Sequence, residues 1–273
     1  MEQIKRVVSA LIIIPPFLWC LLYVPPWLFL GLMLGITWQS LHEYFSLLQE
    51  PMRFPLVCVL VSGLAATVLV VTASFEDGRW LALALFFSVV ALTLSAMMTT
   101  SPVSSPFLIL VTSVFGVLFI GWGLSHIILL RYFPDGKWYI LFLCVVVWVG
   151  DTSAMYAGRS LGRYKMAPTI SPGKTWEGAV AGVLGSALAA LVSAVWLLPQ
   201  LSLWSTVLLG CGISLSAQLS DLGESLLKRH TGHKDSGALI PGHGGMLDRI
   251  DSMLFAAPTL VYMLNVILPV TSP

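Results

Sequence analysis

The residues of this chain that are best suited to chemistry lie in one stretch, residues 225–251, which reads SLLKRHTGHKDSGALIPGHGGMLDRID. The stretch contains four cations and three acids, namely Lys228, Arg229, Lys234, Arg249, Asp235, Asp248 and Asp251. Carboxylates are hard oxygen ligands suited to Mg²⁺, which usually binds one or two of them together with phosphate oxygens. The composition of the stretch therefore predicts a metal-assisted site for a phosphate-bearing ligand.

The chain has three polar groups in its second half, residues 151–177, residues 220–228 and, within the stretch above, residues 234–251. Together the three groups hold seven acids: Asp151, Glu177, Asp221, Glu224, Asp235, Asp248 and Asp251. If residues 203–226 continue as a helix, Asp221, Glu224, Ser225 and Lys228 share one face. Asp248 and Asp251 would share a face if a helix starts near Leu247. Simple surface ion pairs, of Arg249 with Asp248 or of Lys228 with Glu224, remain an alternative explanation.

Glycines surround His243 in the same stretch, at Gly242, Gly244 and Gly245. Glycines let backbone N–H groups approach an anion closely, so the segment is suited to phosphate. His243 either donates to a phosphate or caps the loop.

A second segment, SPGKTWEG at residues 171–178, resembles the end of a P-loop. Pro168 occupies the place of the first glycine and no strand is expected before it, so we exclude a P-loop. Lys174 is still expected to contact phosphate from a turn before a helix that begins at about Thr175.

The bulk of the chain is apolar: 273 residues, 57% hydrophobic and 10% charged, with a mean hydropathy of +0.90. The apolar residues fall in runs long enough to cross a bilayer. We expect an all-α polytopic membrane protein with about nine spans, at about 7–24, 27–48, 55–74, 80–98, 106–130, 138–157, 176–198, 203–226 and 252–270. Residues 1–137 would form about five N-terminal transmembrane helices, and residues 138–273 the catalytic transmembrane region.

The distribution of Lys and Arg predicts the orientation of these helices. With the N-terminus in the cytoplasm, eleven of the fourteen cations lie on the cytoplasmic side. The C-terminus then lies on the opposite side, and all three polar groups face the cytoplasm. The net charge of +1 argues against a nucleic-acid binder. The four cysteines form no CxxC pair and are expected to pack between helices.

Glu43 is the exceptional acid of the first five spans. An acid inside a span suggests function, but we favour a residue near the cytoplasmic end that pairs with His42 or meets water. His126 is expected to pack or hydrogen-bond within its helix.

The stretch 225–251 resembles the signature of the phosphatidate cytidylyltransferases. Its fixed positions are met at Ser225, Lys228, Arg229, Lys234, Asp235, His243, Gly244, Gly245, Asp248, Arg249 and Asp251. The resemblance covers about residues 145–255 and implies transfer of a cytidylyl group from CTP to phosphatidate, giving CDP-diacylglycerol and pyrophosphate with Mg²⁺. It also suggests a homodimer in the membrane, and a second, monovalent cation would suit so many acids. The short-loop, bacterial look of the chain suggests the inner membrane, with the active site on the cytoplasmic side.

The resemblance and the residue types together suggest roles. Asp221, Asp248 and Asp251 are expected to hold the metal, and Lys228, Arg229, Lys234 and Arg249 to act on phosphates. Substrate-binding positions are expected at Ser171, Lys174, Ser225, His243, Gly244 and Gly245. Second choices, as metal ligands or as residues that orient the cations, are Asp151, Asp235 and Glu177.

Two other functions share parts of this pattern. A CTP-dependent polyprenol kinase would also pair membrane helices with a nucleotide, but its alcohol acceptor would need a general base. A transporter would carry acids near the middle of the bilayer, whereas here they gather at one face.

Overall fold

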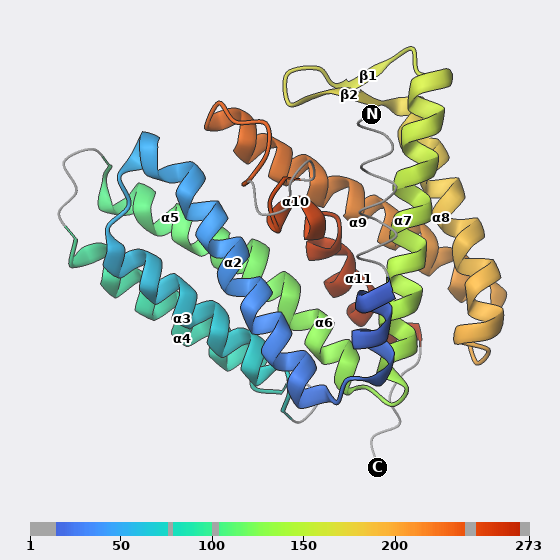
Figure 1. Cartoon of the computed structure of the whole chain (residues 1–273), viewed down its shortest axis with the longest axis horizontal. Coiled ribbons are helices and arrows are strands. Elements are labelled where there is room, and N and C mark those ends of the chain that lie inside the picture. Colours follow the sequence, from blue (N-terminus) through green and yellow to red (C-terminus); the bar gives the residue numbers. More distant parts are fainter. Residues whose placement is uncertain (1–14, 76–78, 100–103, 238–243, 268–273) are drawn as a thin grey trace. The chain divides into compact units, whose positions relative to one another are not determined.

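The computed structural model describes residues 15–75, 79–99, 104–237 and 244–267, and they are mostly helical (Figure 1). After a short helix at residues 15–23, the helices are α2 (Pro26–Met52), α3 (Leu56–Thr72), α4 (Leu81–Met97), α5 (Pro106–Gly116), the π-helix η2 (Val117–Trp122), α6 (Gly123–Tyr132), α7 (Gly136–Ser160), α8 (Trp176–Leu197), α9 (Leu203–His230), α10 (Leu247–Ile250) and α11 (Met253–Ile267). The strands are β1 (Lys165–Ala167) and β2 (Ser171–Thr175).

The chain divides into two compact units, the first made of residues 1–133 and 230–250 and the second of residues 134–229 and 251–273. The division expected at residues 137 and 138 stays a prediction. In the first unit α3 lies beside α4 (Figure 1), and α2 packs against α3, α6 and α10. The core of this unit includes Tyr44, whose hydroxyl donates to the carbonyl of Thr112 at 2.8 Å.

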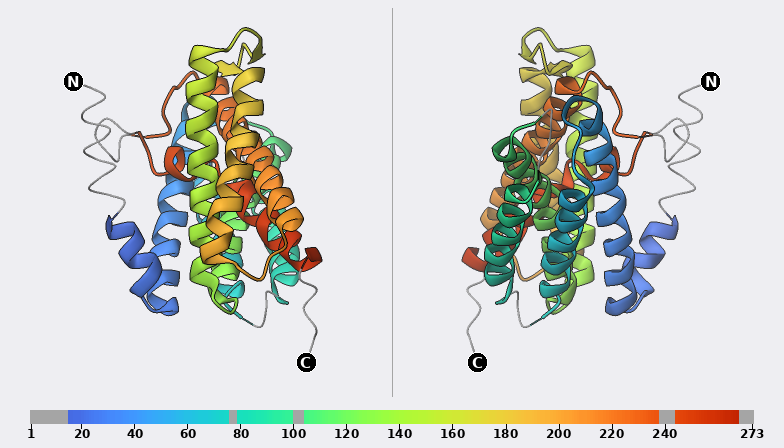
Figure 2. Two further views of the ribbon diagram at one scale, coloured as in Figure 1. Left: turned by 90° about the vertical axis from the view of Figure 1, so that its right-hand side faces the viewer. Right: turned by 90° about the vertical axis from the view of Figure 1, so that its left-hand side faces the viewer.

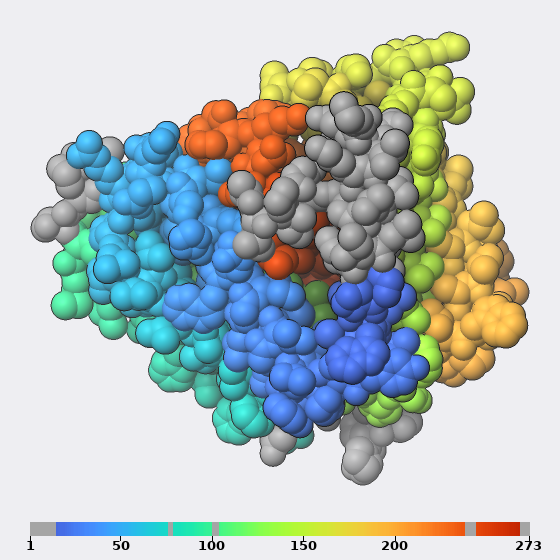
Figure 3. All heavy atoms as spheres, in the orientation of Figure 1, coloured from blue at the N-terminus to red at the C-terminus, as the bar shows by residue number. Residues whose placement is uncertain are grey.

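In the second unit α7 and α8 run side by side over most of their length, as the left view of Figure 2 shows. The β1–β2 hairpin lies at one end of these two helices, and the space-filling view places it against the end of α7 (Figure 3). The hydroxyls of Ser216 on α9 and Thr259 on α11 form a hydrogen bond of 2.7 Å. This unit carries the carboxylates described below.

Five helical segments of the described chain are long and apolar enough to cross a membrane. They are Pro106–Tyr132, Gly136–Ser160, Trp176–Leu197, Leu203–His230 and Leu247–Ile267, and α3 and α4 are shorter apolar helices. The chain is therefore a helical membrane protein. Helices cover most of the described part of each expected span, but the number of nine spans and the orientation stay predictions.

Two local features differ from the sequence expectation. No strand was expected before Pro168, yet β1 ends at Ala167, and residues 165–175 form an antiparallel hairpin in which Lys165 pairs with Thr175. A helix does start at Leu247, the condition for Asp248 and Asp251 to share a face, but it is interrupted at Asp251 and Ser252, which form a turn before α11. Asp248 and Asp251 are thus not on one continuous helix.

Candidate active site

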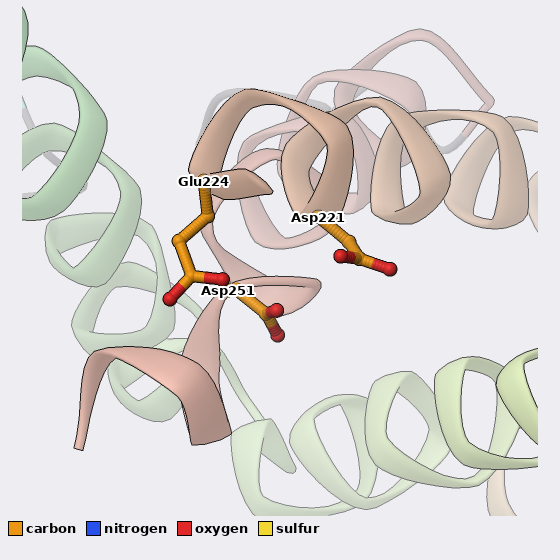
Figure 4. A group of neighbouring side chains, drawn as sticks. All are labelled: Asp221, Glu224 and Asp251. Atoms are coloured by element: carbon orange, nitrogen blue, oxygen red, sulfur yellow. The ribbon is translucent and has the colours of Figure 1, made fainter. Parts of the chain in front are cut away.

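Three carboxylates gather in the second unit, from Asp221, Glu224 and Asp251 (Figure 4). One oxygen of each lies within 4.8 Å of the other two. Asp221 and Glu224 leave successive turns of α9, as their spacing predicts, and Asp251 comes from the turn before α11. Glu224 is fully buried, whereas Asp221 and Asp251 are partly accessible. The donor set consists of hard oxygen ligands and fits a divalent cation such as Mg²⁺.

Two lysines offset the negative charge of this group. The Nζ of Lys174 lies 2.7 Å from Oδ2 of Asp221, and the Nζ of Lys228 lies 2.5 Å from Oε2 of Glu224. The Lys228–Glu224 ion pair was an alternative explanation of the sequence pattern, and it forms. It is not a surface pair, because Glu224 is buried, so its charge depends on nearby cations.

A cavity of about 430 Å³ adjoins these groups within the second unit. Its polar lining includes Asp151, Lys174, Gln218, Asp221 and Asp251, and its apolar lining comes mainly from α7 and α8. The Oγ of Ser252 donates to Oδ2 of Asp151 at 3.3 Å. An anionic ligand with an apolar portion would meet both kinds of surface here.

The hairpin carries Lys174 to the cavity. Ser171 opens β2, and Thr175 ends it and caps α8, where its hydroxyl accepts the Gly178 N–H at 3.1 Å. The helix thus begins where the sequence predicts. Arg229, near the end of α9, donates from Nε to the carbonyl of Ile170 in the hairpin turn at 3.1 Å.

The remaining predicted positions of the second unit have local partners. Ser225 donates from Oγ to Oδ1 of Asp221 at 3.4 Å. Glu177 accepts the Tyr164 N–H at 3.2 Å, which ties the residue preceding β1 to the start of α8.

The first unit holds the other part of the signature stretch. Lys234, Asp235 and Arg249 are exposed, and His243 lies outside the described residues. The Oδ2 of Asp248 accepts the N–H of Ser236 at 2.9 Å, the hydroxyl of Ser236 at 2.9 Å and the N–H of Gly245 at 2.8 Å. Gly244 has φ +79°, a conformation that favours glycine. The phosphate contacts expected of Gly244 and Gly245 stay predictions, and the N–H of Gly245 is engaged within the protein.

Two residues of these arrangements were missed as site residues. Glu224 was counted among the acids, on one face with Asp221 and as a partner of Lys228, but it was not chosen as a metal ligand. Its spacing from Asp221 was the signal for that role. Glu43 was expected to pair with His42 or meet water, but it is buried and accepts the N–H groups of Met246 and Leu247, each at 2.9 Å. No sequence spacing connects it with partners some 200 residues away.

Comparisons with known proteins agree with the signature. A model of the Cytidylyltransferase family matches residues 4–267. The phosphatidate cytidylyltransferase of Staphylococcus saprophyticus is 42% identical over 148 residues, 54% of this chain and 56% of that protein. The protein of the same name from Bacillus subtilis is 43% identical over 149 residues, 54% and 55% of the two chains. That of Rickettsia bellii is 38% identical over 156 residues, 54% and 67%. The chain spans about half the length of the first curated relatives that it matches.

Proposed function

This chain belongs to the cytidylyltransferase family, and from that membership we propose that it transfers a cytidylyl group from CTP to phosphatidate, giving CDP-diacylglycerol and pyrophosphate. The relatives named above bear the name of that activity. The observation that carries the proposal is the carboxylate group of Asp221, Glu224 and Asp251 with Lys174 and Lys228 beside it. Acids that suit a metal and lysines that suit phosphate are what such a transfer requires.

The acceptor supplies its own nucleophile. A phosphate monoester has a second pKa of about 6 and is largely ionised at neutral pH. The attacking phosphate oxygen therefore needs neither a serine or cysteine nucleophile nor a strong base from the protein. The protein must instead hold two polyanions together, align the attacking oxygen with the α-phosphorus and stabilise the spreading charge.

Asp221, Glu224 and Asp251 would hold Mg²⁺, because they offer three hard oxygen ligands in one place. The ion, when bound, supplies charge neutralisation and orientation for the phosphates. The signature also suggests Asp248 as a ligand, but its Oδ2 accepts three hydrogen bonds from its own loop, so we assign the metal to the other three acids and keep Asp248 as the alternative. A monovalent cation, which the number of acids suggested, also remains a proposal.

The cations are assigned to phosphate. Lys174 and Lys228 already lie beside the acids, so both would be near phosphate oxygens that also bind the metal. Arg229, Lys234 and Arg249 are assigned to phosphates of CTP or of the lipid on the strength of the signature. Ser171, Ser225 and His243 would assist in binding.

The membrane arrangement is proposed with the reaction. About nine spans with a cytoplasmic N-terminus in a bacterial inner membrane would place the polar groups where CTP is made, and the acyl chains of phosphatidate would remain in the bilayer. A homodimer, which the resemblance suggests, would be tested by the mass of the purified protein in detergent.

The decisive experiment follows label from CTP labelled at the α-phosphate into the lipid phase, with purified protein, phosphatidate and Mg²⁺. We expect labelled lipid that disappears when EDTA removes the metal and returns when Mg²⁺ is added back. Lipid labelled only from the γ-phosphate, with an alcohol acceptor, would support a polyprenol kinase instead. Ion flux in proteoliposomes without CTP would support a transporter.

A further inference from the structure

We infer that Glu43 of α2 is a positioning residue that fixes both ends of the segment between Ser236 and Leu247. Lys234 and Asp235 come directly before this segment, and Asp248 and Arg249 come directly after it. The effect on catalysis rests on the proposed function, because that function gives these four residues their roles. The hydrogen bonds themselves do not depend on it.

Four donors converge on the Glu43 carboxylate. Its Oε1 accepts the Met246 N–H and a hydrogen from Nε2 of Gln39, each at 2.9 Å. Its Oε2 accepts the Leu247 N–H at 2.9 Å and the hydroxyl of Ser236 at 3.0 Å. Two of the donors come from the start of α10 and one from the far end of the segment. Glu43 therefore joins both ends of the segment to α2.

Ser236 links two carboxylates. Its hydroxyl lies 3.0 Å from Oε2 of Glu43 and 2.9 Å from Oδ2 of Asp248, and its N–H donates to Asp248 as well. A hydroxyl has one hydrogen, so it can donate to only one of them at a time. The two acids thus share one donor and hold Ser236 from both sides.

Close packing supports the same interpretation. A Cβ at Gly245 would lie 2.3 Å from Oε2 of Glu43, and one at Gly237 would lie 3.1 Å from its Cδ. Any side chain at residue 245 would displace the carboxylate from its donors. The glycine is needed there because the segment approaches Glu43 closely.

A neutral side chain could not replace this carboxylate. Glu43 faces four donors, one of them shared with Asp248, and donates no hydrogen bond itself, whereas a glutamine would turn an NH₂ group toward two of the same donors. Hydrogen bonds to a charged acceptor are also stronger than neutral ones. The residue type follows from the four donors rather than from a need for charge in an apolar helix.

The test compares Glu43→Gln with Glu50→Gln, which removes an exposed acid from the same helix. Hydrogen exchange is measured at the amides of Met246 and Leu247 in the full chain in detergent, together with steady-state kinetics. We expect Glu43→Gln to speed exchange at both amides by about tenfold or more, because a hydrogen bond to a charged acceptor is lost. The value of kcat should fall by about 10²-fold, as when a catalytic group is displaced by about 1 Å. Glu50→Gln should change neither quantity.

Two milder variants keep the test decisive if Glu43→Gln does not fold. Ser236→Ala removes one donor, and Glu43→Asp keeps the charge but shortens the side chain. Both should show the same changes to a smaller degree, with an unchanged Mg²⁺ requirement.

Unchanged exchange in folded Glu43→Gln, or faster exchange with full kcat, would overturn the inference. If the wild-type chain transferred no cytidylyl group, the exchange data would still decide whether Glu43 holds the segment, so the two failures are distinguishable.

Discussion

Three carboxylates in the second unit lie close enough to repel one another, and two lysines reduce that repulsion. Asp221 and Lys174 come from different elements, whereas Glu224 and Lys228 are one turn apart on α9. Glu224 carries the larger desolvation cost because it is fully buried. A buried charge is retained only where a cation or metal compensates for it, so Glu224 is the strongest candidate for a metal ligand that the sequence did not single out.

Replacing Glu224 tests that role. We expect Glu224→Gln to raise the Mg²⁺ concentration needed for half-maximal activity by about 10–100-fold, the usual effect of disturbing the surroundings of a metal. The measurement is a Mg²⁺ titration of the labelled-lipid assay. Glu50→Gln, an exposed acid on α2, serves as the control. A superimposable titration with full kcat would remove Glu224 from the metal site.

Asp248 can be tested separately, because its Oδ2 already accepts three hydrogen bonds from its own loop. In Asp248→Asn the amide oxygen can still accept these bonds. We therefore expect a decrease in kcat of about tenfold with the same Mg²⁺ requirement, since only the charged character of the bonds is lost. The same Mg²⁺ titration provides the measurement. A large rise in the Mg²⁺ requirement would instead establish Asp248 as a ligand, as its place in the signature suggests.

At the scale of single residues, the sequence identified which types of side chain form the site. It did not identify all of their hydrogen-bonding partners. The helical spacing of Asp221, Ser225 and Lys228 predicted one face of α9, and the helix forms. The hydrogen bonds of Glu43 could not be foreseen, because its partners Ser236 and Leu247 are 193 and 204 residues away. Periodicity reports on neighbours within a helix and gives no information about such distant pairs.

Among the elements, the packing of α7 against α8 depends on a close approach of the two helices. A Cβ at Gly150 of α7 would lie 2.1 Å from Oγ of Ser186 on α8, and that hydroxyl donates to the carbonyl of Val146 at 3.0 Å. Small residues let membrane helices approach closely and bond across the interface. These two helices also line the cavity, so their separation should affect its shape.

We expect Gly150→Ala to destabilise the protein by about 1–3 kcal/mol, the usual cost of overpacking. Thermal unfolding in detergent measures the effect. Gly31→Ala on α2 is the matched control, because a Cβ there meets nothing within 4 Å. A lowered Tm in both variants, or in neither, would contradict the proposed role of the Gly150 contact.

Hydropathy predicted most of the helical elements, because apolar runs of sufficient length in a membrane protein leave the backbone little alternative to a helix. It did not predict the β1–β2 hairpin. Residues 165–175 are mostly polar or accessible, and their strands are fixed by pairing with each other and by contacts with α7 and α8. The sequence does not reveal the interruption of the last helix at Asp251 either, because the residues on both sides of it favour a helix.

For the whole molecule, the arrangement in the membrane can be tested at the two ends of α8. In a chain without its four cysteines, Thr169→Cys marks the hairpin before α8 and Pro199→Cys marks the loop after it. The excess of cations on one side predicts that Thr169→Cys is labelled from the cytoplasmic side and Pro199→Cys from the opposite side. A membrane-impermeant maleimide applied to sealed vesicles of both orientations provides the measurement.

Labelling of both positions from one side would show that α8 does not cross the membrane. Labelling with the sides exchanged would invert the proposed orientation and place the hairpin away from the cytoplasmic supply of CTP.

The distance along the chain between Glu43 and its partners also has a consequence for biosynthesis. Under the proposed topology, the ribosome delivers Glu43 to the membrane long before it makes Ser236, 193 residues later. Until then the acid lacks three of its four donors and must remain near water, because an unpaired charge in hydrocarbon is costly. A chain whose synthesis stops before Ser236 would never supply the three missing donors to Glu43. We therefore expect such truncated chains to be recognised by membrane quality control and degraded faster than the complete protein.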